Sequence, residues 1–319
     1  MSSVAAANKE TTLLKPAKSK SLWEKIWKYK FLYILIIPGI IYYILFSYIP
    51  MYGVTLAFKK YDWGKSLLAM DWIGLQNFEY LFKQAAFWRA FNNSLIIGVF
   101  KLVTGFLPPI ILVILLNELM VKRYKKFVQS VLYLPYFLSW VIVAGILYSL
   151  LSTTGGVYGK VMLDAGIKAD PVLGNPLYFR WIVYITDIWK YSGWGTIIYL
   201  AAISGISIEQ YESAIIDGAN RFKQIWYITL PSIKFTALII LIISSGYIME
   251  AGFDQIFNLY SEPVYSVGDI IDTYVFRLGI KTAKYDVSTA AGLFKSVINC
   301  ATLLLTNWTV KLTGEEGFY

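Results

Sequence analysis

The sequence predicts an all-α integral membrane protein with six transmembrane helices, and two observations predict it. The first is composition: 57% of the 319 residues are hydrophobic and 15% are charged, whereas soluble globular chains carry about 25% charged residues. The second is that the hydrophobic residues gather in long runs. A run of about 20 apolar residues in helical form crosses the hydrocarbon core of a bilayer.

Six segments are long and apolar enough to be these spans, and inside a bilayer the backbone must satisfy its own hydrogen bonds. The last is interrupted by Lys295 and Asn299. The first is too long for a cleavable signal peptide, and no small-residue cleavage site follows it. Prolines inside the spans predict kinks that neighbouring helices cover. The predicted spans are residues 31–50, 95–116, 127–151, 181–203, 235–251 and 290–310.

The basic residues next to these spans predict their orientation, because short loops rich in Lys and Arg stay in the cytoplasm. The N-terminal tail and the loop after the second span are both basic. Their basic residues are Lys9, Lys15, Lys18, Lys20, Lys25, Lys28 and Lys30 in the tail, and Lys122, Arg123, Lys125 and Lys126 in the loop. Both termini and the loop between spans four and five are therefore expected inside. The predicted first external loop contains three lysines that weaken this charge bias, but long external loops tolerate such charges. They are Lys59, Lys60 and Lys65.

The predicted organisation has three parts. Residues 1–29 form a basic cytoplasmic tail that is rich in small and polar residues at its start, so we expect it to be partly disordered. Residues 30–311 form the transmembrane domain with a cytoplasmic loop at 204–234, and residues 312–319 form a cytoplasmic C-terminal tail. The net charge of +9 reflects this topology rather than nucleic-acid binding, because the basic residues lie beside the apolar segments.

Residue types that the chain lacks exclude several kinds of chemistry. It has no His and one Cys, which excludes most metal sites and every Ser-His or Cys-His catalytic arrangement. Cys300 lies in an apolar stretch and is expected to be a small core residue. Residues 154–160 come nearest to a phosphate-binding loop, but the leading Gly is missing and Val161 replaces the required Ser or Thr. We therefore expect no catalytic residue, metal site or ATP site in this chain.

The loop between spans four and five has the pattern of two short helices separated by a glycine. Ser207 suits a helix N-cap with Glu209 in the first turn, and Gly218 suits a helix end. A second amphipathic stripe then leads to Pro231, where the fifth span is expected to begin. The stripe consists of Phe222, Ile225 and Trp226. A short helix that a glycine turn holds under the membrane is suited to receive a movement from a partner protein.

The amino-acid sequence of this loop resembles the EAA loop of binding-protein-dependent ABC importer permeases. Residues 212–219 read Glu-Ser-Ala-Ile-Ile-Asp-Gly-Ala, and residues 228–231 read Ile-Thr-Leu-Pro. The family pattern is Glu-Ala-Ala, two residues, Asp-Gly-Ala, then Ile-x-Leu-Pro. The chain departs from the usual residues at Ser213 and Ile225, and neither departure removes the Glu, the Gly or the Pro.

The resemblance implies a MetI-like permease fold whose loop docks in a cleft of a separate cytoplasmic ATPase dimer. That dimer, not this chain, would bind ATP and Mg. Glu212 would contact a basic residue there, and Gly218 would allow the tight break. The residues expected to couple the chain to the ATPase are Glu212, Ala214, Asp217, Gly218, Ala219 and Pro231.

A second resemblance points to sugar uptake. Residues 74–78, Gly-Leu-Gln-Asn-Phe, and 87–94, Phe-Trp-Arg-Ala-Phe-Asn-Asn-Ser, look like stretches of the carbohydrate-uptake branch. The first span, with Pro38-Gly39 and Tyr48-Ile-Pro-Met-Tyr-Gly53, is similar to the subgroup that handles complex oligosaccharides. These likenesses imply a second homologous permease as heterodimer partner and an extracellular solute-binding protein that delivers an oligosaccharide.

The same family binds sugar on the helices before and after its EAA loop. Sugar recognition needs aromatic faces together with hydrogen-bonding groups, and the two helices offer both at helical spacing. The expected substrate-binding residues are Lys190, Tyr191 and Trp194 on the fourth span, and Ser244 and Tyr247 on the fifth. Trp194, Ser244 and Tyr247 match family pocket positions. The alternative is that all of these residues only pack helices together.

Charged residues inside the spans allow two interpretations. An unpaired charge at bilayer depth costs about 2.5–3.5 kcal/mol on insertion scales. Asp187 and Lys190 lie three residues apart on one predicted helix, so they could pair locally. Alternatively they line a polar translocation path, in which Lys190 or Lys101 would favour an anionic sugar.

Two other functions remain open from the sequence. A permease for peptides or amino acids would carry the same coupling loop. A polytopic membrane enzyme, such as a lipid-linked glycosyltransferase, would need a carboxylate cluster or metal site at a membrane face, and the external loops show only scattered Asp and Glu.

Overall fold

The computed structural model describes residue 23, residues 27–315 and residue 317. The stretch of the tail expected to be disordered therefore lies outside the described residues. The described part is helical, and its isolated β-bridge joins Lys59 to Trp72. The chain divides into two compact units, residues 1–53 and 54–319.

The first unit contains an almost uniformly apolar helix. It consists of α2 (Lys30–Tyr43), a π-helical turn η1 (Ile44–Tyr48) and α3 (Ile49–Met51), and the 3-10 turn η2 (Tyr52–Phe58) continues it. None of the residues of α2 is buried within the chain, as expected for a helix that is hydrophobic all round and faces lipid. The 29 residues from Lys30 to Phe58 are long enough to cross a membrane, which confirms the first predicted span.

The second unit contains three more continuous helices of membrane-spanning length and two bent helix pairs. The continuous ones are α5 (Ala85–Glu118), the helix Arg221–Ser245, which ends in α12 (Leu230–Ser245), and α16 (Tyr285–Leu312). The bent pairs are α6 (Lys122–Tyr133) with α7 (Trp140–Leu151), and α9 (Pro176–Ser204) with α10 (Ile208–Ile216). If each bent pair counts as one span, the described chain has six spans, in agreement with the sequence.

The third predicted span is wrong as a continuous helix. After α6 a 3-10 turn η3 (Leu134–Phe137) ends the first half, and α7 leaves at 96°. Ser139 caps the new helix, because its Oγ accepts a hydrogen bond from the Ile142 amide at 3.3 Å. Pro135 within η3 cannot donate a backbone hydrogen bond, which favours a break at this place.

The fifth predicted span is displaced. Its helix begins at Arg221 and ends at Ser245, whereas residues 235–251 were expected from the apolar run. A π-helical turn, η4 (Ile225–Thr229), directly precedes Pro231, which cannot hydrogen-bond to the preceding turn. The interpretation of Cys300 as a core residue is also wrong, because Cys300 is exposed on the described chain.

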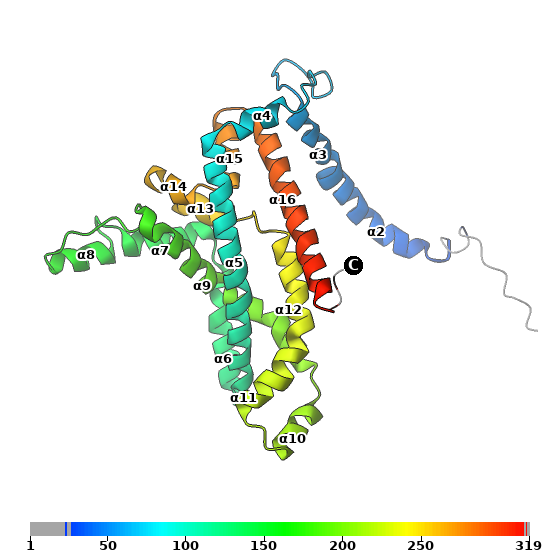
Figure 1. Ribbon diagram of the computed structural model, residues 1–319, viewed down its shortest axis with the longest axis vertical. Coiled ribbons are helices and arrows are strands. Elements are labelled where there is room, and N and C mark those ends of the chain that lie inside the picture. The colour runs from blue at the N-terminus through cyan, green and yellow to red at the C-terminus, as the bar shows by residue number, and fades with distance from the viewer. Residues whose placement is uncertain (1–22, 24–26, 316, 318–319) are drawn as a thin grey trace, which may run out of the picture. The chain divides into compact units, whose positions relative to one another are not determined.

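Glycines let the helices of the second unit approach one another closely. A Cβ atom on Gly98 of α5 would lie 1.7 Å from the Ile248 carbonyl oxygen, and one on Gly193 of α9 would lie 2.0 Å from the Leu132 carbonyl oxygen. Small residues at such contacts allow backbone-to-backbone packing inside a membrane. Within this unit, α4 (Gln76–Phe82) lies at one end of α5 and α10 lies at the other end (Figure 1).

Short helices outside the spans complete the second unit. They are α8 (Val157–Asp164), α13 (Phe253–Leu259), η5 (Glu262–Val264), α14 (Tyr265–Gly268), α15 (Ile271–Phe276) and η6 (Arg277–Lys281). The buried Asp269 carboxylate accepts two hydrogen bonds from Arg277, at 2.7 and 2.6 Å. Burial lowers the pKa of the Arg277 guanidinium, but the hydrogen bonds and charge of Asp269 outweigh it and raise that pKa. This bidentate pair fixes the segment between spans five and six.

Candidate functional site

The loop after α9 has the predicted helix, glycine break and helix. The α10 helix begins after Ser207, whose Oγ accepts a hydrogen bond from the Glu209 amide at 3.3 Å. Gly218 takes a φ of +76°, which a side chain would disfavour. The Gly218 amide donates to the Ile215 carbonyl at 3.0 Å, and the Ala219 amide donates to the Ala214 carbonyl at 2.8 Å. These two bonds form a Schellman motif, so Gly218 ends the helix as expected.

Polar side chains that the sequence interpretation missed hold the second half of the loop. Asn220 caps α11 (Arg221–Gln224), since its Oδ1 accepts from the Lys223 amide at 2.9 Å. The buried Gln224 donates from Nε2 to the Ala219 carbonyl at 3.0 Å. The Tyr211 and Thr229 hydroxyls lie 2.9 Å apart and tie α10 to η4. An Asn two residues before a predicted stripe is an N-cap signal that could have been recognised.

The predicted coupling residues lie together on this loop. Glu212, Asp217 and Gly218 are exposed, Ala214 and Ala219 are half-buried, and Pro231 lies in the first turn of α12. Exposed Ile215 and Ile216 add an apolar surface beside Glu212. An acidic residue next to exposed apolar side chains is suited to a protein partner rather than to solvent.

Lys190 occupies the break in the third span. Its side chain is buried, and Nζ donates hydrogen bonds to the carbonyls of Pro135 at 3.2 Å, Tyr136 at 2.8 Å and Leu138. The last carbonyls of a helix have no partner within the helix, and lipid offers none. Lys190 therefore satisfies the broken end with all three of its donors. Of the two alternatives that the sequence left open, the local pair between Lys190 and Asp187 does not form, because each has another partner.

Aromatic rings surround this ammonium and extend to Trp194. Lys190 Nζ lies 5.4–5.8 Å from the ring centroids of Tyr136, Trp140 and Tyr191, a range in which cations are attracted to ring faces. The Tyr191 hydroxyl accepts from Trp140 Nε1 at 3.1 Å. Trp194 stacks on Tyr136 with centroids 4.2 Å apart and planes 3° apart. Since Trp194 is 39% exposed, one side of the stack stays accessible.

A polar cavity of about 480 Å³ opens beside Lys190. Two of the predicted site residues, Lys190 and Tyr191, line it. Trp194 reaches it only through the stack with Tyr136, and the lining residues include neither Ser244 nor Tyr247. Tyr247 is exposed and lies in the turn after α12, not on the helix as expected. The lining residues that sequence reasoning missed are Tyr136, Leu138, Ser139, Trp140, Val141, Asp254 and Asn258.

A buried ion pair lies behind this cavity. Lys101 of α5 and Asp187 of α9 are 2.8 Å apart, and each side chain is 12% exposed. Lys101 also donates to Gln255 Oε1 of α13, and Gln255 Nε2 donates to the Val183 carbonyl at 2.7 Å. Gly252, with a φ of +94°, gives Lys101 room, because a Cβ there would lie 2.6 Å from Nζ. The pair therefore joins three elements at membrane depth.

Asp187→Ala is expected to destabilise the protein strongly, because it leaves Lys101 as an uncompensated buried charge. Removing one partner of such a pair lowers the free energy of unfolding by roughly 3–5 kcal/mol. Replacing both charges with apolar side chains often leaves that free energy nearly unchanged. The Lys101→Met/Asp187→Leu double variant should therefore recover most of the loss. Unfolding midpoints of the purified protein in detergent measure both effects. A single variant as stable as the wild type would contradict this role of the pair.

Comparison with known proteins decides the family. A family model described as the binding-protein-dependent transport system inner membrane component matches residues 110–308. This chain belongs to that family. It is a multi-pass membrane permease with the predicted MetI-like fold, and it is not an enzyme.

Close relatives cover nearly the whole permease. The polygalacturonan/rhamnogalacturonan transport system permease protein YteP of Bacillus subtilis (strain 168) is 38% identical over 310 residues, covering 97% of each chain. Protein LplB of the same organism is 37% identical over 311 residues, covering 98% of each. A chain of a bacterial alginate ABC transporter, crystallised with an alginate pentasaccharide-bound periplasmic protein, has a TM-score of 0.84 and 39% identity. The match covers 93% of this permease and 99% of that chain.

Proposed function

We propose that this permease imports an acidic oligosaccharide as one half of an ATP-driven transporter. The observation that carries the proposal is the buried cation of Lys190 beside the 480 Å³ cavity. Among the described residues, no carboxylate forms an ion pair with Lys190; backbone carbonyls hold it. A cation that keeps its net charge next to a polar cavity attracts an anionic solute.

The N-terminus of α7 adds to this attraction. Ser139, Trp140 and Val141 at the start of α7 line the same cavity as Lys190. A helix N-terminus carries roughly half a positive charge, and broken helices of transporters direct such ends at anionic substrate groups. Asp254, which also lines the cavity, is an acceptor for sugar hydroxyls. The relatives support the same class, because the names of two of them refer to polygalacturonan and alginate, which are acidic polysaccharides.

Aromatic faces supply the remaining sugar contacts in this proposal. Trp194, stacked on Tyr136, and Tyr191 present ring surfaces beside the cavity. Ser244 of the fifth span and Tyr247 of the turn after it do not line the cavity within this chain; in this proposal they face the part of the cavity that the second homologous permease completes from its own side. An extracellular solute-binding protein delivers the oligosaccharide.

Energy comes from a separate ATPase dimer that binds ATP and Mg. Its cleft receives α10, with Glu212 on a basic residue and Ile215 and Ile216 on apolar surface. Closure of the ATPases on ATP moves α10 as a rigid unit. Because the Schellman turn and the Tyr211–Thr229 contact link α10 to the helix Arg221–Ser245, the movement passes into the fifth span and turns the cavity outward. ATP hydrolysis then returns the cavity to its starting orientation.

The substrate class is tested most simply on the solute-binding protein that works with this permease. Titration calorimetry against a panel of uronate oligosaccharides, their carboxyl-reduced forms and peptides is expected to show binding of the uronate forms. Preference for peptides or amino acids would overturn the sugar assignment, and preference for the carboxyl-reduced forms would overturn the acidic one.

The proposed orientation places residues 1–29, the loop at 204–234 and residues 312–319 in the cytoplasm. In a Cys300→Ser background, Gln76→Cys is expected to react with a membrane-impermeant maleimide in intact cells. Ser213→Cys, which is exposed on α10, is expected to react only after permeabilisation. The reverse pattern would contradict the orientation.

A further inference from the structure

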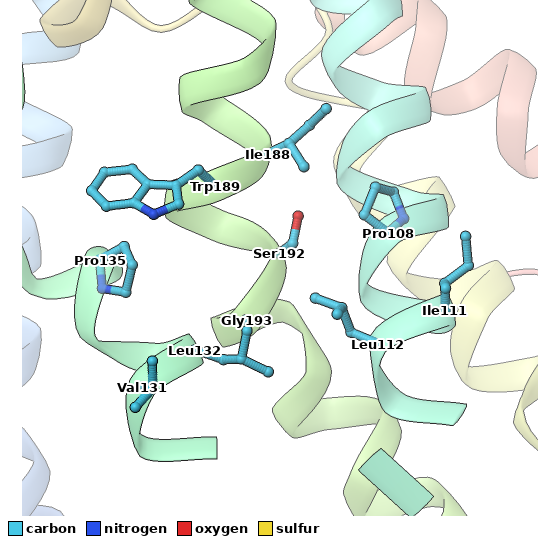
Figure 2. Close-up of a pocket in the computed structure, with 10 residues that line it drawn as sticks. All are labelled: Pro108, Ile111, Leu112, Val131, Leu132, Pro135, Ile188, Trp189, Ser192 and Gly193. Atoms are coloured by element: carbon cyan, nitrogen blue, oxygen red, sulfur yellow. The ribbon is translucent and has the colours of Figure 1, made fainter. Parts of the chain in front are cut away.

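A second cavity, of about 390 Å³, lies between α5, α6 and α9 and is almost entirely apolar. Pro108 and Leu112 of α5 form one wall, Leu132 of α6 and Pro135 of η3 form the other, and α9 forms the floor (Figure 2). Ser192 on the floor contributes the one side-chain hydroxyl of the lining. We refer to this cavity as the apolar crevice.

The apolar crevice is separate from the proposed sugar site. Trp189, Ser192 and Gly193 of α9 line the crevice, whereas Lys190 and Tyr191 line the polar cavity. At about 100° per residue, the first set and Trp194 project to opposite sides of the helix. The solute proposed above therefore does not reach the crevice.

The apolar crevice lies near the middle of the bilayer. Pro108 is ten residues before the end of α5 at Glu118, and Leu132 is ten residues after the start of α6 at Lys122. Ten helical residues span about 15 Å, which is half of a hydrocarbon core about 30 Å thick. The crevice thus lies one leaflet away from the ends of α5 and α6, where residues 119–121 connect the two helices.

Charge at that end indicates what enters the crevice. The first turns of α6 carry four basic residues; Lys122, Arg123 and Lys126 are exposed, and Lys125 is half-buried. Lys125 precedes Leu132 by seven residues, so the two lie toward the same side of α6. A basic cluster at a membrane surface attracts anionic headgroups. An apolar crevice of one-leaflet depth above such a cluster matches a phospholipid, with its headgroup on the basic turns.

The buried hydroxyl of Ser192 is consistent with an apolar occupant. Ser192 is 5% exposed, and Oγ has no hydrogen-bond partner among the described residues. It points into the crevice (Figure 2). A helical Ser can turn its hydroxyl to the carbonyl four residues earlier, so a hydrocarbon chain does not leave it permanently unpaired.

We propose that the apolar crevice binds one acyl chain of an anionic phospholipid of the cytoplasmic leaflet, whose headgroup lies on the basic first turns of α6. The assignment of the leaflet rests on the orientation proposed above, which the maleimide labelling tests separately. The site does not depend on the identity of the transported solute.

The test is native mass spectrometry of the complete transporter, released from membranes that contain phosphatidylglycerol and phosphatidylcholine. The wild type is expected to retain phosphatidylglycerol. Ser192→Phe, and the smaller Ser192→Leu, fill the crevice and are expected to lose that lipid. The matched control is Ile198→Phe, which adds a ring to an exposed position of the same helix and should retain it. Lys125→Gln/Lys126→Gln should lower the preference for phosphatidylglycerol about fivefold per lysine.

Crosslinking identifies what covers the crevice in the assembled transporter. A photoreactive benzoylphenylalanine at Leu112 is expected to yield an adduct with the mass of a phospholipid. An adduct with the second permease would overturn the proposal, because the crevice would then be a subunit contact. Equal lipid retention by the wild type and both Ser192 variants would also overturn it.

Discussion

Gly218→Pro is expected to abolish coupled transport while the solute-binding protein keeps its affinity. Gly218 has a φ of +76°, which the proline ring cannot adopt. Its amide also donates to the Ile215 carbonyl at 3.0 Å, and proline has no N–H. Because proline disfavours such a ψ at the preceding residue as well, Asp217 would leave its present conformation, with φ −75° and ψ 5°. Together these changes are expected to destabilise the turn by roughly 3 kcal/mol or more. The end of α10 would then shift from the position in which we propose that it docks on the ATPase.

Uptake and ATPase activity of the reconstituted transporter measure this effect. Uptake by Gly218→Pro is expected to fall on the order of 100-fold, and stimulation of the ATPase by the loaded binding protein should disappear. Gly205→Ala is the matched control, because Gly205 caps α9 at a φ of −84° and a Cβ there meets nothing closer than 3.4 Å. It should transport normally. Normal transport by Gly218→Pro would contradict the role of the turn.

Lys190→Met is expected to remove the cation of the cavity and the support of the break in the third span together. Three carbonyls, those of Pro135, Tyr136 and Leu138, lose their donor. Each buried unsatisfied group costs about 1–3 kcal/mol, so η3 should shift and move Tyr136 away from Trp194. Uptake of an acidic oligosaccharide is therefore expected to fall roughly tenfold or more.

A comparison of substrates separates the two roles of Lys190. If the charge attracts the solute, Lys190→Met should reduce uptake of a uronate oligosaccharide more than uptake of its carboxyl-reduced form. Lys234→Met is the control, because Lys234 is exposed and pairs with Glu315 at 2.6 Å, away from the lining of the cavity. Equal losses for both substrates would assign Lys190 to the helix break alone.

Local patterns in the sequence were sufficient for much of this fold. Apolar length alone predicted the number of spans, although the third is bent and the fifth is displaced, because lipid leaves helices as the main option for the backbone. The coupling loop was also predictable, since Ser207 and Gly218 act through hydrogen bonds to residues near them in the chain. Such caps depend little on tertiary context.

The interior of the spans was less predictable, because it depends on contacts between distant residues. Asp187 has Lys190 three residues away, yet it pairs with Lys101 at 2.8 Å. The helix breaks after Pro135, and Lys190, more than fifty residues later in the chain, donates hydrogen bonds to the carbonyls at this break. Hydrophobicity was also misleading at the end of the fifth span, where residues 246–251 are mostly apolar apart from Glu250, but Gly246 ends the helix. Tyr247 consequently left the helical face on which its predicted role was based.

Reconstituted uptake tests the central claim most directly. The permease, its partner permease, the ATPase dimer and the solute-binding protein would be combined in proteoliposomes with a labelled uronate oligosaccharide. We expect the labelled oligosaccharide to accumulate in the proteoliposomes in a way that requires ATP and the loaded binding protein. Gly218→Pro is expected to prevent this accumulation. Uptake without ATP, or uptake of peptides in preference to the uronate oligosaccharide, would contradict it.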